Sequence, residues 1–101
     1  MPLKKVYDKA KSRCKVTFSL AAEEAGEPAK LFLAGDFNDW DPRAKAMRKS
    51  GGLFSASVEL EAGRQYQYRF VTDQGVWMND TEADLYVYSA FADSDNSVAA
   101  L

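Results

Sequence analysis

Two segments of the chain alternate apolar and polar side chains residue by residue, and this pattern constrains the fold more than any other. In YQYRFVT (66–72) the rings of Tyr66, Tyr68 and Phe70 alternate with glutamine, arginine and valine, and LFSASVEL (53–60) shows a similar alternation. Side chains in a β-strand point alternately to opposite faces of the sheet, so this period predicts strands with one buried face. The three aromatic side chains of residues 66–72 are therefore expected in the core.

Short apolar segments bounded by turn residues recur along the rest of the chain. Strands are also expected over residues 14–20, 30–35, 45–50, 76–79, 84–91 and 96–101. KLFLAG (30–35) is apolar on both faces, which is typical of a central strand, and KAMRKS (45–50) is expected as a short edge strand. About seven to eight short strands with regularly spaced turns, and no long helical period, predict an all-β fold, an antiparallel β-sandwich.

The composition of the chain excludes several functions. The 101 residues suffice for one core, and a net charge of -2 argues against a general nucleic-acid binder. The chain has no histidine, which removes the commonest general base and metal ligand, and Cys14 has no partner for an internal disulfide. No apolar run reaches the roughly 20 residues that cross a bilayer. We therefore expect a cytoplasmic protein that binds neither membrane nor nucleic acid, with Cys14 buried as a small apolar residue.

The two ends of the chain differ in character. Residues 1–13 are rich in lysine and are expected to form a loosely ordered N-terminal arm. Residues 14–101 contain the expected strands and no linker, so they are expected to form a single domain.

The turn GDFNDWDP (35–42) places Trp40 among residues that favour contact with water. The indole of Trp40 either covers the core from this loop or stands exposed for a ligand, and Phe37 is the better core candidate of the two. In VWMND, Trp77 alternates with Val76 and Met78, so one side of that segment must face outward. The residues alone leave core and surface open for Trp77.

The order of the motifs resembles a known family of binding modules. LFLAGDFNDWDP, a Gly-Gly turn, and then LFSASVELEAGRQYQYRFVTDQGVWMND resemble the starch- and glycogen-binding module of carbohydrate-binding family 48. This family includes the glycogen-binding domain of the AMP-activated protein kinase β-subunit and the N-terminal domains of isoamylases and glycogen branching enzymes. The resemblance covers roughly residues 14 to 101. It implies an immunoglobulin-like β-sandwich that binds α-1,4-linked glucans.

The resemblance also implies which side chains bind the sugar. The two stacking tryptophans of the family fall on Trp40 and Trp77, its basic strand residue on Arg69 of QYRF, and its late apolar residue on Phe91 of SAF. The family's asparagine before the last strand falls on Asp95 or Asn96, of which we prefer Asn96. The chain departs from the family at Gln74, which lengthens the turn before Trp77, at Asn79, where histidine is common, and at Asp80-Thr81, where Asp-Pro is frequent.

Carboxylates suggest two other kinds of site. Asp36, Asn38, Asp39 and Asp41 lack the spacing of a calcium loop, so no metal or other cofactor is expected. A pair of carboxylates also serves glycosidases, but the enzymes of the resemblance keep catalysis in a separate barrel domain that this chain lacks. We therefore expect a module without catalysis that binds a glycogen- or starch-like polysaccharide or a maltooligosaccharide, and targets itself or a partner to storage glucan. The alternatives are a regulatory or scaffold module that binds a protein partner, and an accessory domain derived from an isoamylase- or branching-type glycoside hydrolase.

Overall fold

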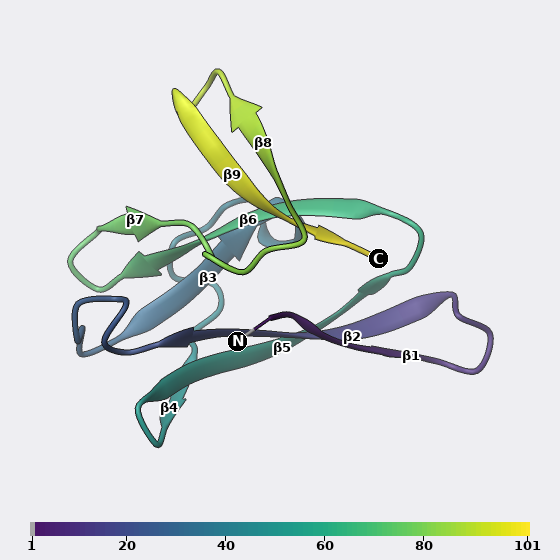
Figure 1. The fold of residues 1–101 in the computed structure, drawn as a ribbon, viewed down its shortest axis with the longest axis horizontal. Helices are drawn as coiled ribbons and strands as arrows, with labels where there is room; N and C mark the ends of the chain where they lie inside the picture. The colour runs from purple at the N-terminus through teal and green to yellow at the C-terminus, as the bar shows by residue number, and fades with distance from the viewer. Residues whose placement is uncertain (1) are drawn as a thin grey trace.

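The computed structural model describes residues 2–101, which form nine β-strands in two antiparallel sheets (Figure 1). The strands are β1 (Lys4–Tyr7), β2 (Arg13–Ala21), β3 (Leu31–Gly35), β4 (Arg48–Ser50), β5 (Leu53–Glu61), β6 (Gln65–Thr72), β7 (Trp77–Met78), β8 (Leu85–Ser89) and β9 (Ser94–Ala100). Helical structure in residues 2–101 is confined to the 3-10 helix η1 (Asp36–Asn38). No helix of these residues is long and apolar enough to cross a membrane. The predicted all-β, immunoglobulin-like sandwich is confirmed.

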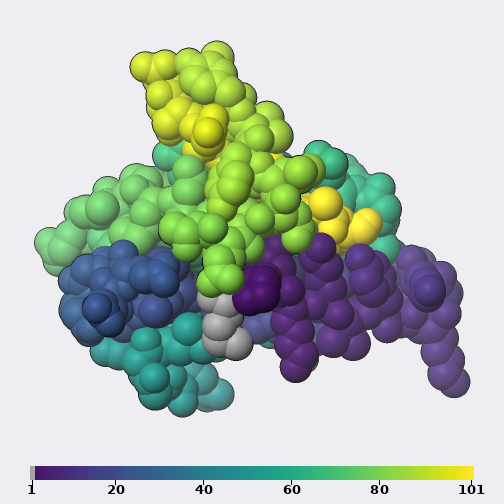
Figure 2. Space-filling view, in the orientation of Figure 1, coloured from purple at the N-terminus to yellow at the C-terminus, as the bar shows by residue number. Residues whose placement is uncertain are grey.

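Strand pairing sets the positions of the functional side chains. One sheet has the order β1-β2-β5-β4, and the other has the order β3-β6-β9-β8, with β7 also paired to β6. Strand β9 pairs with Gln65–Tyr68 of β6, whereas β7 pairs with Phe70 and Val71 further along β6. Strands β9 and β7 therefore follow one another along the same edge of β6. The β8–β9 hairpin extends beyond the body of the sandwich (Figure 1 and Figure 2).

The core lies between the two sheets and is centred on aromatic side chains. The rings of Phe18 and Tyr68 meet edge to face, with their centroids 4.7 Å apart, and Phe70 packs edge to face against Tyr68. Tyr66, Tyr68 and Phe70 are buried, as their alternation predicts, and Cys14 is fully buried as well. Burial of these rings is the main stabilising contribution, because each removes a large apolar area from water.

Strand β3 lies at the end of its sheet, and the prediction of a central strand for residues 30–35 is wrong. Its free edge is covered by the segment before β4, where the Leu33 N–H donates to the Lys45 carbonyl and the Met47 N–H donates to the Leu31 carbonyl, both at 2.9 Å. Its outer face is covered by Trp40. The strand is buried on both faces without a second neighbouring strand of the same sheet, which explains its apolar sequence.

Residues 4–7 differ from the loosely ordered arm expected for residues 1–13. They form β1, which pairs with β2 from Lys4 opposite Thr17 to Tyr7 opposite Cys14. The Lys5 Nζ donates to the carbonyl of Ala100 in β9 at 2.9 Å and lies 2.7 Å from a carboxylate oxygen of Asp84, the residue before β8. Lysine is common on edge strands, where its charge discourages pairing with other chains, so lysine richness here marks an edge strand rather than disorder.

A buried carboxylate, that of Asp80, lies against the β3-β6-β9-β8 sheet. Asp80 is only 2% exposed, and its side chain accepts hydrogen bonds from the Tyr68 hydroxyl at 2.7 Å and from the Glu82 N–H at 2.9 Å. Burial raises the pKa of Asp80 above its ordinary value, and the hydrogen bonds from Glu82 and Tyr68 only partly oppose this effect. The native state therefore binds a proton at Asp80 more tightly than the unfolded chain does.

Replacing Asp80 by asparagine is expected to remove a pH-dependent part of the stability. The pKa of Asp80 is higher in the folded state than in the unfolded chain. Ionisation of Asp80 therefore destabilises the wild type as the pH rises from the unfolded-state pKa through the folded-state pKa. The free energy of unfolding of the wild type should thus fall relative to that of Asp80→Asn as the pH is raised from acidic towards neutral. Urea denaturation of both proteins across this range measures the difference, and parallel curves would contradict the prediction.

Candidate functional site

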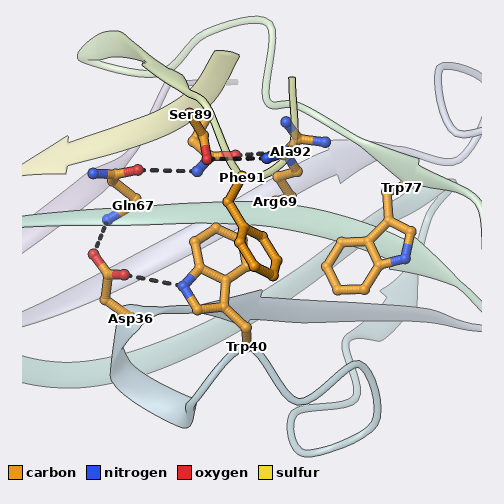
Figure 3. Close-up of a pocket in the computed structure, with 9 residues that line it drawn as sticks. Asp36, Trp40, Gln67, Arg69, Trp77, Ser89, Phe91 and Ala92 are labelled. Carbon is orange, nitrogen blue, oxygen red and sulfur yellow. Dashed lines mark hydrogen bonds between the residues drawn. The ribbon is translucent and has the colours of Figure 1, made fainter. Parts of the chain in front are cut away.

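A pocket of about 680 Å³ opens on the outer face of the β3-β6-β9-β8 sheet (Figure 3). On β6, Tyr66, Tyr68 and Phe70 point into the core, so the side chains of Gln67 and Arg69 point to the opposite face. The lining residues come from the turn after β3, from β6, β7 and β9, and from the β8–β9 hairpin: Asp36, Trp40, Gln67, Arg69, Trp77, Ser89, Phe91, Ala92 and Asn96. Sheet pairing thus brings together segments that are far apart in the sequence.

The turn that carries Trp40 is fixed by its own hydrogen bonds. The Asn38 side chain accepts from the Gly35 N–H at 3.0 Å and donates to the Leu33 carbonyl at 2.9 Å, and the Trp40 N–H donates to the Gly35 carbonyl at 3.0 Å. Asp39 and Trp40 both have left-handed backbone conformations, with φ of 56° and 57°. Such a conformation in a bulky residue costs about 1–3 kcal/mol and persists where the surrounding contacts enforce it.

Gly35 lets this turn lie directly against strand β6. A Cβ atom at this position would lie 2.6 Å from the Gln67 carbonyl oxygen and 2.9 Å from the Phe37 ring. Because the first of these is a backbone atom, it cannot move aside without disturbing the sheet. The lack of a side chain at Gly35 therefore keeps the turn and its tryptophan beside the polar residues of β6.

The indole of Trp40 is half-buried and forms one wall of the pocket. It packs against a small apolar cluster of Phe32, Ala34 and Val71 on the outer face of the sheet. Its Nε1–H donates to Asp36 Oδ1 at 3.0 Å, and the other carboxylate oxygen of Asp36 accepts from the Gln67 N–H at 2.8 Å. Trp40 thus covers part of the sheet and also presents apolar surface to the pocket.

Arg69 lies at the floor of the pocket within a group of hydrogen bonds. Its Nε donates to Asn96 Oδ1 at 2.6 Å, and its Nη2 donates to the Asp95 carbonyl at 2.7 Å and to the Ser94 hydroxyl. The Asn96 Nδ2 donates in turn to Gln67 Oε1 at 2.9 Å. The Nη1 group of Arg69 makes no hydrogen bond within residues 2–101, so it remains available as a donor.

Trp77 and Phe91 supply apolar surface from two other directions. Trp77 pairs with Val71 across β7 and β6, is 40% exposed, and lies on the far side of the pocket from Asp36 (Figure 3). Phe91 is 104% exposed at the tip of the β8–β9 hairpin, and its ring points down towards Trp40 (Figure 3). Large apolar side chains left this open to water, around one pocket, are typical of surfaces that bind a ligand or a partner.

The structure brings all five expected site residues to this one pocket. The pocket is lined by all of Trp40, Arg69, Trp77, Phe91 and Asn96. Asn96 is only 6% exposed, and the oxygen and the nitrogen of its side-chain amide both form hydrogen bonds with other side chains. The sequence alone left core or surface open for Trp77, and the structure shows that its indole is exposed, as is the ring of Phe91.

Asp36 and Gln67 also line the pocket, and the sequence reasoning missed both. The alternation of residues 66–72 already placed Gln67 on the same face as Arg69, so that signal was present. The contact of Asp36 with residue 67 joins positions 31 apart and left no trace in the local pattern.

The acidic turn uses its polar side chains internally. Asp36 binds Trp40 and Gln67, Asn38 binds Gly35 and Leu33, and Asp41 accepts from the Arg43 N–H at 2.9 Å. Residues 2–101 contain no cluster of three or more histidine, cysteine, aspartate or glutamate side chains that could hold a metal ion. Hydrogen bonds of this kind account for Asp36 and Asp41, whereas the exposed Asp39 side chain makes none within residues 2–101.

Comparison with known proteins agrees with this geometry. The family model for carbohydrate-binding module 48 (isoamylase N-terminal domain) matches residues 6–92. The chain is also similar to 1,4-alpha-glucan branching enzyme GlgB 2 from two strains of Xanthomonas campestris pv. campestris, with 38% identity over 48 residues in each case. That match covers 46% of this chain and 7% of each enzyme, so the chain corresponds to a small part of these relatives. With most of its length matched by the family model, the chain belongs to carbohydrate-binding module family 48, the family of the isoamylase N-terminal domain.

Proposed function

We propose that this protein is a module without catalysis that binds α-1,4-glucan, of the glycogen or starch type, in the pocket between Trp40, Trp77 and Phe91. One observation carries the proposal: three aromatic side chains from separate elements converge on a single open pocket with hydrogen-bonding groups between them. The volume of about 680 Å³ lies within the range of about 300–1,000 Å³ that is usual for sites that bind small ligands.

The residue types suit a chain of pyranose rings. A pyranose has faces of C–H groups and edges of hydroxyls, so a flat aromatic ring covers the face without leaving a hydroxyl unpaired. Because an α-1,4-glucan curves, successive rings change their tilt, and separate aromatic rings on Trp40 and Trp77 suit this curvature. The free Nη1 donor of Arg69 and the Nε2 group of Gln67, whose Oε1 already accepts from Asn96, are available to bind ring hydroxyls.

The expected affinity of the single module is modest. Stacking one indole on one sugar removes on the order of 100 Å² from water, or about 2.5 kcal/mol, and two stacks give roughly 5 kcal/mol before the costs of association. A dissociation constant between about millimolar and tens of micromolar follows. Many chain ends on one glycogen particle would raise the effective affinity by multivalency, so such a module is adequate to target itself or an attached partner to storage glucan.

The carboxylates around the pocket support binding rather than hydrolysis. Glycosidases need two carboxylates about 5–9.5 Å apart across the bond that is cleaved. Asp36 is the one carboxylate among the pocket-lining residues that the structure describes, and both of its oxygens already accept hydrogen bonds. A cytoplasmic location, where glycogen is stored, is part of the proposal and agrees with a single, unpaired cysteine.

A second candidate function, binding an extended segment of a protein partner, is supported by strand β8. It lies at the end of its sheet, and it exposes apolar side chains and carries no charge: LYVYS. The edge strands β1 and β4 carry lysine and arginine, which discourage such pairing, whereas β8 does not. A partner segment would extend the sheet at β8. The branching-enzyme relatives suggest one such setting, an accessory domain within a larger enzyme.

Retardation in a native gel tests the proposed function. Migration of the wild type should slow in a gel cast with glycogen, and maltoheptaose should quench or shift tryptophan fluorescence at up to millimolar concentration. Because the ligand is uncharged, the fitted affinity should change little between low and moderate salt. Cellohexaose, whose β-1,4 linkages give a flat chain, is the matched control. Equal response to both sugars, or no response to either, would refute α-glucan binding, and release of reducing sugar from glycogen would refute the absence of catalysis.

Replacing Arg69 by lysine is expected to weaken maltoheptaose binding about 10-fold, which is the lower end of the roughly 1.5–3 kcal/mol that a hydrogen bond of a charged group contributes. Lysine keeps the charge but loses the planar fork that binds Asn96 and Asp95 while leaving Nη1 for the sugar. Isothermal titration of the variant measures this loss. Arg48→Lys, on the edge strand β4 of the other sheet, is the matched control and should bind like the wild type. Wild-type affinity in Arg69→Lys would show that charge alone matters.

A further inference from the structure

We propose that Asp36 is a positioning residue, which holds the indole of Trp40 in the orientation that stacks on a sugar ring. This inference rests on the proposed function of the pocket. Its carboxylate bridges two elements: Oδ1 accepts from Trp40 Nε1 at 3.0 Å, and Oδ2 accepts from the backbone N–H of Gln67 at 2.8 Å. The side chain of Asp36 thereby connects a residue in a turn to a strand of the sheet.

The indole needs such a connection because apolar packing alone does not fix it. Trp40 rests on Phe32, Ala34 and Val71, and apolar contact has no preferred direction, so it does not specify the rotation of the ring. A hydrogen bond at the edge of the ring fixes this rotation, because it specifies where Nε1 must lie. Strand β6 is a suitable anchor, since it pairs with β3 on one side and with β9 and β7 on the other.

The same bond defines what Trp40 offers to a ligand. The one polar hydrogen of the indole is already donated to Asp36, so the ring presents apolar surface and its π-electrons rather than a donor. A carboxylate acceptor also increases the electron density of the ring, which favours contact with the partially positive C–H groups of a sugar face. Trp40 is therefore set to stack, whereas hydrogen bonding is left to Arg69 and Gln67.

Asp36 also places the stacking ring and the polar groups in one frame. The backbone of Gln67 donates to Asp36, and the side chain of the same residue accepts from Asn96, which accepts from Arg69. A shift of Gln67 would move both sides of the pocket together. The spacing between the stacking surface and the guanidinium, which must match a sugar ring and its hydroxyls, is thus maintained.

Three variants test this role: Asp36→Ala removes both bonds, Asp36→Asn keeps an acceptor for only one of them, and Asp39→Asn removes a neighbouring charge. Asp39 is exposed, makes no side-chain hydrogen bond in residues 2–101, and has a left-handed conformation that asparagine tolerates. Two measurements are made on each: the ¹H–¹⁵N resonance of the Trp40 indole, assigned with a Trp77→Phe variant, and the affinity for maltoheptaose.

We expect Asp36→Ala to move the Trp40 indole N–H resonance upfield and to speed its exchange with water, because the bond to Asp36 is lost. Binding should weaken about 10-fold, because a displaced indole no longer matches the sugar ring. Asp36→Asn should show a smaller change of both kinds, and Asp39→Asn should match the wild type. Lost affinity in Asp36→Ala with an unmoved resonance would mean that Asp36 contacts the sugar itself. An equal loss of affinity in Asp39→Asn would mean that Asp36 acts only through its charge. Either result overturns the inference. The resonance reports on Asp36 without any sugar, so a wild type that binds no maltoheptaose would refute the proposed function separately.

Discussion

Replacing Trp40 by alanine is expected to lower the affinity for maltoheptaose about 70-fold, the equivalent of roughly 2.5 kcal/mol for one lost indole–sugar stack. The indole is half-buried, packs on Phe32 and Val71, and presents apolar surface to the pocket. The same change uncovers these two side chains, so a moderate loss of thermal stability should accompany the loss of binding. Isothermal titration with maltoheptaose, together with circular dichroism to show that the sheets remain, measures both effects.

Trp40→Phe separates the two consequences of this change. Phenylalanine keeps a smaller apolar ring over the cluster of Phe32, Ala34 and Val71 but lacks the N–H that binds Asp36. Stability should recover more than affinity does. If Trp40→Ala still binds within a factor of two of the wild type, Trp40 acts only to cover strand β3, and the proposed stacking site is wrong.

Replacing Trp77 by alanine is expected to lower the affinity by a similar factor, about 30- to 70-fold, without a measurable change in stability. Trp77 lies on the two-residue strand β7, and 40% of its surface is exposed. It belongs to neither of the two buried apolar clusters, so its removal should affect the ligand rather than the fold. Fluorescence titration of Trp40, the remaining tryptophan, and thermal unfolding measure the two effects.

Tyr7→Ala is the matched control for Trp77→Ala. Tyr7 has the same exposed fraction, 40%, but belongs to edge strand β1 of the opposite sheet. The control should bind maltoheptaose like the wild type, because an exposed aromatic ring has no effect outside the pocket. A loss of affinity in Tyr7→Ala as large as that in Trp77→Ala would show that exposed aromatic residues bind the sugar nonspecifically.

Local sequence patterns determined the strands and their faces. The alternation of Tyr66, Tyr68 and Phe70 correctly placed three rings in the core, because neighbouring side chains on any strand point to opposite faces. Glycine turns were equally readable: Gly51, Gly52 and Gly75 have left-handed backbone conformations that other residues rarely adopt. Properties that depend on a residue and its near neighbours were therefore available from the sequence.

The motif resemblance reached further, to individual side chains of the pocket. It pointed to Trp40, Arg69, Trp77, Phe91 and Asn96, which all line the same cavity. The resemblance implied a binding role for each of them but not the hydrogen bonds that hold them in place. The side-chain oxygen of Asn96 accepts a hydrogen bond from Arg69, and its nitrogen donates one to Gln67. Asn96 therefore supports the floor of the pocket and is also part of its lining.

Tertiary structure decided which strands are neighbours and which side chains meet. An apolar strand such as β3 has the same sequence whether another strand of its sheet or the segment at residues 45–47 covers its edge, so its edge position was not predictable. The pairing of β1 with β2 and the bond from Asp36 to residue 67 likewise join distant segments. Side-chain alternation is a local property of a strand, whereas the partner of a strand and the far end of a hydrogen bond depend on how the whole chain packs. The sequence by itself therefore determined the sandwich and the polar turn that carries Trp40, and only the packed chain determined how the two tryptophans, Phe91 and Arg69 surround one pocket.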